Sequence, residues 1–444
     1  MPFMMQNSAP TDPPDKTATR LGANADYKRL FAAVALTFLG DGLTLTAVPW
    51  LISGVTRDAF EASLVTTAMR LPWLLFSLPI GVVIDRYSRK NIAVASSLLR
   101  AIVLIALTAC VALEAINIPL LMLFTFLIGA SRVAFDSTVQ TLIPRIVHKD
   151  QLEKANGQFT AGQLITSDIL GASLGGLIVA AGLILPFAID SVTALIAFAL
   201  LLALSSAFRP ETAQAGDTVP DDASDSVLPK RSGWLQEMAI GFRHIREDSF
   251  LRLLALMSVL VTLTFSGMVA TQVFFVQDVL GLNSFGFGVL LAIATVGSVI
   301  GGQAVGRWRR KMSASSIMLI SLIALGVFYG IAGLTRSPYV VGAAYFCAAF
   351  FIVTYNVVRS SILQRAVPDR LLGRVGGVFR FLSLGMGAIG ALLGGWIVSA
   401  GEKSLGLGRV AALQLPYGIV SVVDLALAVI AALWLRRIGP ARGI

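Results

Sequence analysis

Long apolar stretches alternate with short polar segments along almost the whole chain. Each stretch has the length that a helix needs to cross the hydrocarbon core of a bilayer, which is about 20 residues. The stretches lack the alternation of a β-barrel strand, and backbone in lipid must satisfy its own hydrogen bonds, so helices are expected. The pattern predicts twelve spanning helices, at residues 30–53, 62–84, 92–114, 118–138, 157–181, 183–208, 251–275, 284–305, 313–335, 338–358, 376–400 and 413–435.

The composition agrees with a chain that faces lipid. Of the 444 residues, 56% are hydrophobic and 14% are charged. A soluble domain carries roughly a quarter charged residues. The deficit argues against an aqueous fold, and it leaves the net charge of +10 at pH 7 to be explained.

Lysine and arginine follow the alternation of the loops. Most of them lie in the tails and in the loops on the side of the N-terminus, including the basic run at 307–311. The loops on the other side carry Arg57, Arg336, Lys403 and Arg409. This positive-inside bias predicts that both termini are cytoplasmic. The basic charge therefore indicates topology and contact with anionic lipid rather than nucleic-acid binding.

Polar segments divide the chain into parts. We expect a cytoplasmic tail, an N-terminal six-helix bundle, a cytoplasmic linker, a C-terminal six-helix bundle and a second tail, at residues 1–29, 30–208, 209–249, 250–436 and 437–444. The linker is rich in proline and aspartate, which predicts flexibility. Its last part, 233–247, alternates apolar and charged residues and predicts an amphipathic helix along the inner membrane face, or alternatively a helix that binds a partner.

Motifs repeat between the two halves. Gly81, Asp85, Arg86, Arg89 and Lys90 read G-x-x-x-D-R-x-x-R-K, and 221 residues later Gly302, Gly306, Arg307, Arg310 and Lys311 read G-x-x-x-G-R-x-x-R-K. Residues 145–159 match residues 365–379 at an offset of 220, and Gly171-x-x-x-Gly175-Gly176 matches Gly390-x-x-x-Gly394-Gly395 at an offset of 219. The agreement of the offsets indicates a six-plus-six duplication.

Two six-helix halves with a basic turn after the second span, echoed after the eighth, resemble the major facilitator superfamily. Within it, the strings GDGLTLTAVPWL at 40–51, LIPRIVHKDQLEKANG at 142–157 and FGFGVLLAIATVGSVIGG at 285–302 resemble the branch of drug, macrolide, tetracycline and enterobactin exporters. The resemblance implies an all-α membrane protein with twelve transmembrane helices in two pseudo-symmetric bundles, a monomer that moves a small-molecule substrate by alternating access.

The resemblance also implies a gating role for the basic turns. Gly81 would let neighbouring helices approach closely, and Asp85 and Arg86 would pair across the cytoplasmic seam. Arg89 and Lys90 would lie near lipid headgroups and helix ends, with a role as topology anchors as the alternative. The second turn, with Gly302, Arg307, Arg310 and Lys311, and Asp136 beside the first turn complete the expected gate.

The glycine runs of the fifth and eleventh spans have two interpretations. Gly171, Gly175, Gly176, Gly390, Gly394 and Gly395 allow tight helix packing, and they are also suited to an exporter-specific hinge.

Ionisable residues inside the spans are candidates for function, because charges in a membrane are costly. The candidates for proton coupling or substrate binding are Asp41, Arg70, Asp168, Asp190 and Asp424. Asp41 lies near mid-depth between Gly40 and Gly42, which would leave room for ligand or water. Arg70 is expected at a similar depth, so Asp41 either forms an ion pair with Arg70 or binds a proton or a cation. Arg132 and Asp136, one turn apart, are expected to pair with each other, or with Arg89.

Other chemistries find little support in the sequence. Cys110 and Cys347 form no spaced motif, and His148 and His244 lie outside the spans, so we expect no metal site. No Walker loop occurs, so ATP is not the expected energy source, and no cofactor is expected.

The sequence therefore predicts a secondary transporter and not an enzyme, most simply a proton-coupled exporter of amphipathic drug-like molecules. The cavity would be lined by spans 1, 4, 7 and 10, with Phe265, Met268, Phe274, Tyr345, Phe346 and Phe350 as candidate walls. A siderophore, metabolite or lysolipid exporter is the nearest alternative. A membrane sensor or scaffold without transport is the alternative from another class.

Overall fold

The structure, a computed structural model, describes residues 21, 24–77, 79–205 and 234–438. The predicted tails, and the linker up to residue 233, lie largely outside these residues. The helices of the first half are α1 (Ala25–Val55), α2 (Ala59–Phe76), α3 (Pro79–Arg86), α4 (Arg89–Ala112), α5 (Ile118–Ile146), η2 (Lys149–Gln151), α6 (Leu152–Gln163), η3 (Leu164–Gly171), α7 (Ala172–Ala181) and α8 (Leu185–Leu202). The helices of the second half are α9 (Trp234–Glu247), α10 (Ser249–Phe274), η5 (Phe275–Val279), α11 (Ser284–Trp308), α12 (Ala314–Leu334), α13 (Pro338–Ala366), α14 (Asp369–Lys403) and α15 (Arg409–Ile438).

The helices account for the twelve predicted spans. In the described part of the chain, ten helices are long and apolar enough to cross a membrane alone. The second span is made of α2, which ends at Phe76, and α3, which begins at Pro79, a residue suited to the first turn of a helix. The fifth span is made of α6, the π-helical segment η3 and α7. The fold is an all-α membrane protein, as predicted.

Short polar residues begin several of the helices. Asn24, Asp58, Asn117 and Asp248 each accept hydrogen bonds on their side chains from backbone N–H groups of the first turn. These caps satisfy donors that have no partner inside the helix, and they place the helix ends at the polar loops.

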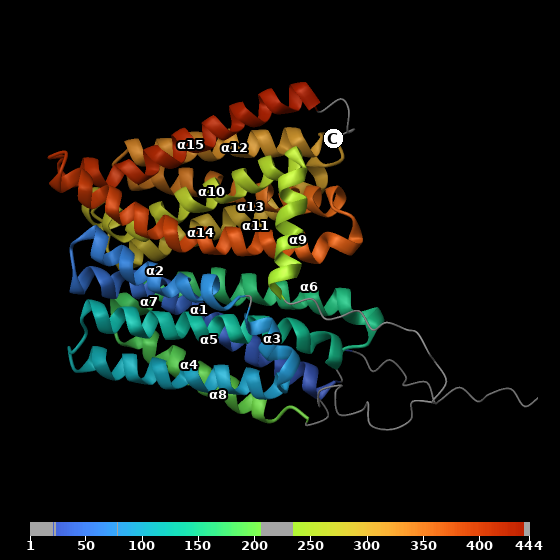
Figure 1. Ribbon diagram of the computed structural model, residues 1–444. Coiled ribbons are helices and arrows are strands. Elements are labelled where there is room, and N and C mark those ends of the chain that lie inside the picture. Colours follow the sequence, from blue (N-terminus) through green and yellow to red (C-terminus); the bar gives the residue numbers. More distant parts are fainter. Residues whose placement is uncertain (1–20, 22–23, 78, 206–233, 439–444) are drawn as a thin grey trace, which may run out of the picture.

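Two bundles lie side by side, one formed by α1–α8 and the other by α10–α15 (Figure 1). The main contacts between them are made by α2 with α14 and by α7 with α11. These are the second span with the eleventh and the fifth with the eighth, so the two seams are related by the internal duplication.

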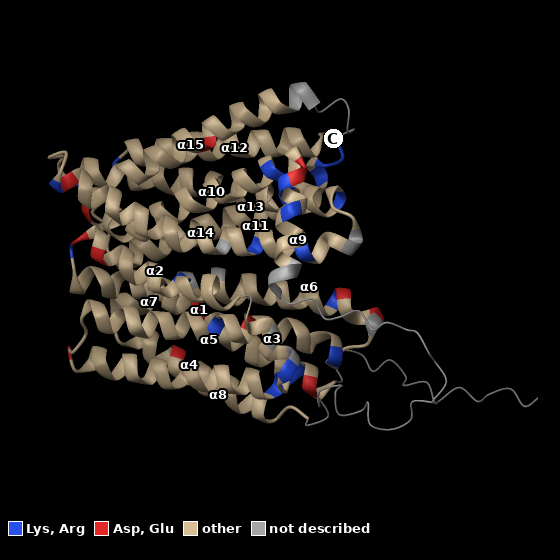
Figure 2. Cartoon of the chain, viewed as in Figure 1, with Lys and Arg blue, Asp and Glu red and all other residues tan. Residues whose placement is uncertain are grey.

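The two ends of the bundle differ in charge. Lysine and arginine gather at the end where α9 lies (Figure 2). We call this the charge-rich end, and the opposite end, with the α1–α2 and α14–α15 loops, the charge-poor end. The positive-inside rule predicts that the charge-rich end is cytoplasmic.

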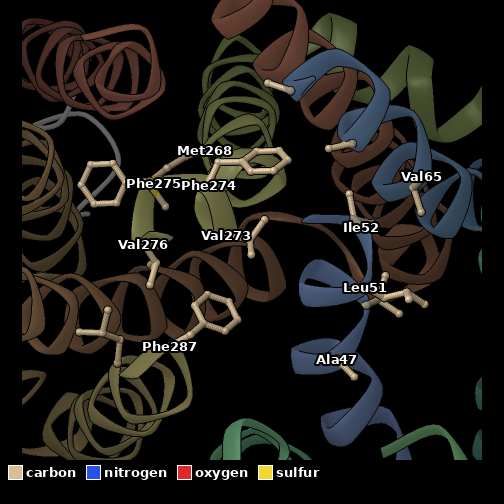
Figure 3. Packing of buried hydrophobic residues seen from close by; sticks show 14 of the residues in the cluster. Ala47, Leu51, Ile52, Val65, Met268, Val273, Phe274, Phe275, Val276 and Phe287 are labelled. Atoms are coloured by element: carbon tan, nitrogen blue, oxygen red, sulfur yellow. The ribbon is translucent and has the colours of Figure 1, made fainter. Parts of the chain in front are cut away.

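The hydrophobic core is shared at one end and divided at the other. A cluster of buried residues at the charge-poor end joins both halves, with Leu51 and Ile52 of α1 and Val273 of α10 among its members (Figure 3). Toward the charge-rich end, the cores are separate. One contains residues such as Leu142 of the first half, and the other contains residues such as Leu322 of the second. The halves are therefore sealed together at the charge-poor end.

The predicted amphipathic helix is present as α9, which runs across the other helices at the charge-rich end (Figure 1). Its Gly241 lies against the backbone of Arg374 in α14, and Ile245 is buried. Phe242 and Arg243 face outward. The helix therefore packs on α14 and keeps a second face free.

Candidate functional site

A cavity of about 700 Å³ lies between the two halves. Its walls come from α1, α2 and α5 of the first half and from α10, α11, α12 and α13 of the second. The predicted walls from spans 1, 4, 7 and 10 are all present, and α2, α11 and α12 add residues that the prediction did not include. The volume is in the range of sites for drug-sized ligands.

The aromatic predictions for this cavity are partly confirmed. Phe265, Met268 and Tyr345 line it, together with Trp73, which the sequence does not single out. Phe274, Phe346 and Phe350 are not among its lining residues. Phe274 is fully buried in the core, and Phe350 packs on Trp308. The apolar pattern of a span does not tell which side of the helix faces the cavity, so these assignments required the structure.

Five charged side chains of the first half form one cluster, which we call the carboxylate–guanidinium cluster: Asp41, Arg100, Arg132, Asp136 and Asp190. Arg100 is at its centre, with Nη1 2.6 Å from Asp41 Oδ1 and Nη2 2.9 Å from Asp190 Oδ2. Arg132 Nη1 lies 3.3 Å from Asp41 Oδ2, and its Nε lies 3.5 Å from Asp136 Oδ2. Asp41 and Arg132 also line the cavity. The cluster thus connects the cavity to the interior of the bundle.

The charges of this cluster do not balance. Among the directly paired groups, three carboxylates face two guanidinium groups, which leaves one carboxylate in excess; the positive charge of Arg70 acts on Arg132 but forms no ion pair with a described carboxylate. The side chains of Arg100, Asp41 and Asp190 are 4%, 4% and 0% exposed. Because unbalanced charge is costly away from water, the cluster can be neutralised by binding one proton.

The expected pair between Asp41 and Arg70 is wrong. Asp41 pairs with Arg100 and Arg132, whereas Arg70 has no ion pair or hydrogen bond with any described residue and lines the cavity. Helix rise predicts the depth of a residue, but it does not give the direction in which each side chain points. Arg100 is recognisable in the sequence as a charge inside a span, but the sequence contains no signal for its partners.

The glycines beside Asp41 do not leave room for a ligand, contrary to the expectation. A side chain on Gly40 would overlap the carboxylate of Asp190, and one on Gly42 would overlap Ser167 in η3. Small residues are needed here because helices cross closely. Thr44, one turn further, donates a hydrogen bond of 2.6 Å to Asp190 Oδ2.

The remaining candidate carboxylates lie in different surroundings. Asp424 on α15 is 2% exposed, and its Oδ1 has no hydrogen-bond partner among the described residues. It is not among the residues that line the cavity. The side chain of Asp168 lies outside the described part of the chain, although its backbone is placed in the π-helical segment η3.

The first basic turn joins α3 to α4 at the charge-rich end. Lys90 Nζ donates to the carbonyl oxygen of Leu202, 2.9 Å away, and to that of Leu204, so it caps the end of α8. A cation at this position also complements the helix dipole. The pairing predicted for Asp85 cannot be followed, because its side chain lies outside the described residues, and Arg86 is exposed.

The close helix approach expected at Gly81 is absent from this conformation, since an added Cβ there would have no heavy atom within 4 Å. The reason is that the close contacts between the halves lie at the opposite end of the bundle. In the second turn, Gly302, Arg307, Arg310 and Lys311 are also exposed.

The two glycine runs make equivalent contacts. Gly171 packs on Gly42 of α1, as its equivalent Gly390 packs on Leu263 of α10, both within their own halves. The last glycine of each run contacts a helix of the other half. Gly176 would place a Cβ 2.7 Å from the Cα of Gly288 in α11, and a Cβ on Gly395 would overlap Ser63 in α2. Gly175 and its equivalent Gly394 likewise contact Thr46 and Gly267 in their own bundles.

Ion pairs connect the halves at the charge-poor end. Lys403 Nζ lies 2.6 Å from Asp58 Oδ2, and Arg57 lies 3.6 Å from Asp278. Gln277 donates a hydrogen bond of 2.8 Å to Ser53. Burial by itself raises the pKa of the Asp58 carboxyl, but the hydrogen bonds from Lys403 and from backbone N–H groups, with the charge of Lys403, outweigh it and hold this pKa below its usual value.

Comparisons with known proteins agree with this architecture. Residues 30–391 match the family described as Major Facilitator Superfamily. The chain is 28% identical over 381 residues to the multidrug efflux pump Tap of Mycolicibacterium fortuitum, covering 84% of this chain and 88% of Tap. It is 23% identical over 402 residues to the enterobactin exporter EntS of Escherichia coli O6:K15:H31, covering 86% and 89%.

The fold is similar to that of a solved nucleoside transporter, NupG, with a TM-score of 0.73, 13% identity and coverage of 92% of this chain and all of that one. The match to the family covers most of the chain, and its relatives in sequence are efflux proteins. The chain is therefore a membrane transporter of the Major Facilitator Superfamily and not an enzyme.

Proposed function

We propose that this protein is a proton-driven exporter of amphipathic small molecules in a bacterial cytoplasmic membrane, working as a monomer by alternating access. The cavity between the halves would bind the substrate. The shared core and the ion pairs at the charge-poor end would close the outer side, so that the structure corresponds to an inward-facing state. Rocking of the two bundles would then expose the cavity to the outside.

The observation that carries the proposal is the position of Asp41. It lines the cavity and also belongs to a cluster with one carboxylate in excess. A proton on Asp41 would neutralise the cluster and weaken its hold on Arg100 and Arg132. These arginines come from α4 and α5, so the protonation state would act on the packing of three spans. The relationship to Tap supports export of drug-like substrates.

The experiment measures proton flux in liposomes that contain the purified protein and a pH-sensitive dye, with a panel of amphipathic antibiotics and dyes as substrates. We expect substrate-dependent proton flux with the native protein and with Asp41→Glu, and at least about a tenfold loss with Asp41→Asn, since proton transfer then lacks its acceptor. Glu114→Gln, an exposed loop position, is the matched control. Flux that persists in Asp41→Asn would remove Asp41 from the mechanism, and no flux with any compound would favour a scaffold.

A second candidate substrate class is a secreted iron chelator, which the relationship to the enterobactin exporter supports. A strain that lacks its own siderophore exporter and expresses this protein would then release siderophore into the medium. If the protein is present in the membrane in normal amounts and no chelator appears in the medium, drug-like molecules remain as the proposed substrate class.

A further inference from the structure

We infer that Arg70 is a binding site for an anionic group on the substrate, so that the preferred cargo is an amphipathic anion such as an organic acid with an aromatic body. The inference rests on the proposed use of the central cavity as the substrate site. It concerns only what this cavity recognises, whichever energy source drives transport.

The charged side chain of the cavity that has no ion-pair partner in the described part of the chain is positive. Among the described lining residues, the charged ones are Asp41, Arg70 and Arg132. Both oxygens of Asp41 lie within ion-pair distance of guanidinium groups, Oδ1 2.6 Å from Arg100 and Oδ2 3.3 Å from Arg132, although Oδ2 accepts no hydrogen bond from a described residue. A cationic substrate would therefore find no free carboxylate among these residues and would have to displace an arginine to reach one.

Arg70 differs from the other two arginines in its partners. Arg100 and Arg132 each have a carboxylate within 3.5 Å, whereas Arg70 has no ion pair or hydrogen bond with a described residue. An unpaired guanidinium beside an apolar wall is costly, and a carboxylate, sulfonate or phosphate that enters the cavity would supply the missing charge. The planar guanidinium also offers paired donors that suit these anions.

A second unused donor lies beside Arg70. A Cβ added to Gly387 of α14 would lie 3.3 Å from Arg70 Nη1 and 3.4 Å from Ser266 Oγ. The Ser266 hydroxyl, on α10, is buried and has no hydrogen-bond partner within the described ranges. Two donors without acceptors thus lie close to Gly387, where even an added methyl group would be tightly packed. They come from both halves of the protein, on α2 and α10.

The rest of the wall suits an apolar or aromatic body. Trp73 lies one turn from Arg70 on α2, and Phe265, Met268 and Phe287 come from the opposite half. An anion held by Arg70 would keep its aromatic part among these side chains, where burial of apolar surface adds to the affinity. Export of an anion also moves negative charge outward, which a membrane potential that is negative inside favours.

The test compares acids with their uncharged esters. N-dansylglycine and N-dansylphenylalanine, each beside its methyl ester, bind to the purified protein in detergent while energy transfer from tryptophan, including Trp73, to the dansyl group is recorded. We expect each acid to bind at least about tenfold more tightly than its ester, the fold-change typical of a charge-assisted pair. Arg70→Gln should abolish this preference, and Arg70→Lys should keep part of it.

Three variants separate the site from general effects. Arg336→Gln removes one positive charge from an exposed loop and should leave the preference unchanged. Gly387→Ala fills the space between the two donors and should weaken binding of the acids without affecting that of the esters. Ser266→Ala should weaken binding of the acids less than Arg70→Gln. All variants are checked for monodisperse elution.

Equal binding of acid and ester by the native protein, no binding of either acid, or a preference that survives in Arg70→Gln would overturn the inference. Binding at equilibrium in detergent requires neither a proton gradient nor export. If the preference for acids depends on Arg70 but no proton flux occurs in liposomes, the anion site is supported and the proposed proton coupling is refuted. The reverse pattern would refute the anion site alone.

Discussion

Among single residues, the position of Arg100 explains why the carboxylates of Asp41 and Asp190 can remain inside the first bundle. Its guanidinium lies between Asp41 and Asp190, and all three side chains are almost fully buried. Buried ion pairs of this kind add little stability relative to apolar residues, but removal of one partner leaves an uncompensated charge. Arg100 is therefore a structural requirement for the carboxylates around it.

This position yields a stability prediction. Arg100→Met would leave Asp41 and Asp190 without their shared cation and should lower the free energy of unfolding by about 3–5 kcal/mol. Thermal unfolding in detergent measures the effect, with Arg336→Gln as a control. A double variant, Arg100→Met with Asp190→Leu, should recover part of the loss because one stranded charge is gone. A single variant as stable as the native protein would contradict the central role of Arg100.

Among the helices, the glycine runs determine how close the two halves can come. Gly176 and Gly395 occupy equivalent places in the duplicated halves, and each contacts a helix of the opposite bundle. The sequence leaves packing and hinge roles open. The structure supports close packing across the seam, and the π-helical segment η3, which ends at Gly171 just before α7 begins, shows where the fifth span departs from regular helix.

Substitution of Gly176 by leucine should hinder closure of the charge-poor end, since the new side chain would collide with Gly288 and Ser284 in α11. Overpacking of this kind costs about 1–3 kcal/mol, which is roughly a fivefold or larger shift away from the closed form. A disulfide between Ser53→Cys and Gln277→Cys, in a background without Cys110 and Cys347, reports closure. Gly418→Ala, with open space around it, should leave the cross-link unchanged. Equal cross-linking in Gly176→Leu would refute the seam contact.

Across the entire protein, the hydrophobic cores and the ion pairs between the halves agree on one conformation. The core is continuous between the halves at the charge-poor end and divided toward the charge-rich end. The pairs Lys403–Asp58 and Arg57–Asp278 lie at the same closed end. These pairs are partly exposed, so we expect them to adjust the equilibrium between states rather than to determine the fold.

The lowered pKa of Asp58 predicts how closure depends on pH. In the closed protein, Asp58 stays ionised to lower pH than in the open protein. The Lys403–Asp58 pair therefore favours closure at pH values above the ordinary pKa of 3.8. Its contribution to the free energy of closure is lost as the pH falls through the lowered pKa. The fraction of closed protein, measured from the distance between spin labels on cysteines at positions 53 and 277, should stay constant from neutral pH down to about pH 5 and decline only in stronger acid. Lys403→Gln should weaken closure at neutral pH and remove the acid-dependent decline. A decline in the closed fraction centred near neutral pH would show that a titratable group other than Asp58 controls closure.

Much of this architecture could be predicted because it depends on local free energies. The transfer of apolar side chains into lipid defines the twelve spans, and the distribution of basic residues divides the molecule into two ends. The duplication, the helix α9 and the presence of Asp41 as a charge inside a span could likewise be predicted from residue types and spacing. None of these requires knowledge of which helices touch.

The partners of the buried charges depend instead on packing between helices. Asp41 and Arg70 both line the cavity, yet α1 directs its carboxylate toward α4 and α5, and Arg70 forms no ion pair with a described residue. The rotation of each helix about its axis depends on packing against several neighbours at once, as Gly40 beside Asp190 illustrates. The hydrophobic pattern of one helix predicts its depth in the membrane but not its rotation. An ion pair depends on the rotations of two helices, so it cannot be predicted from that pattern.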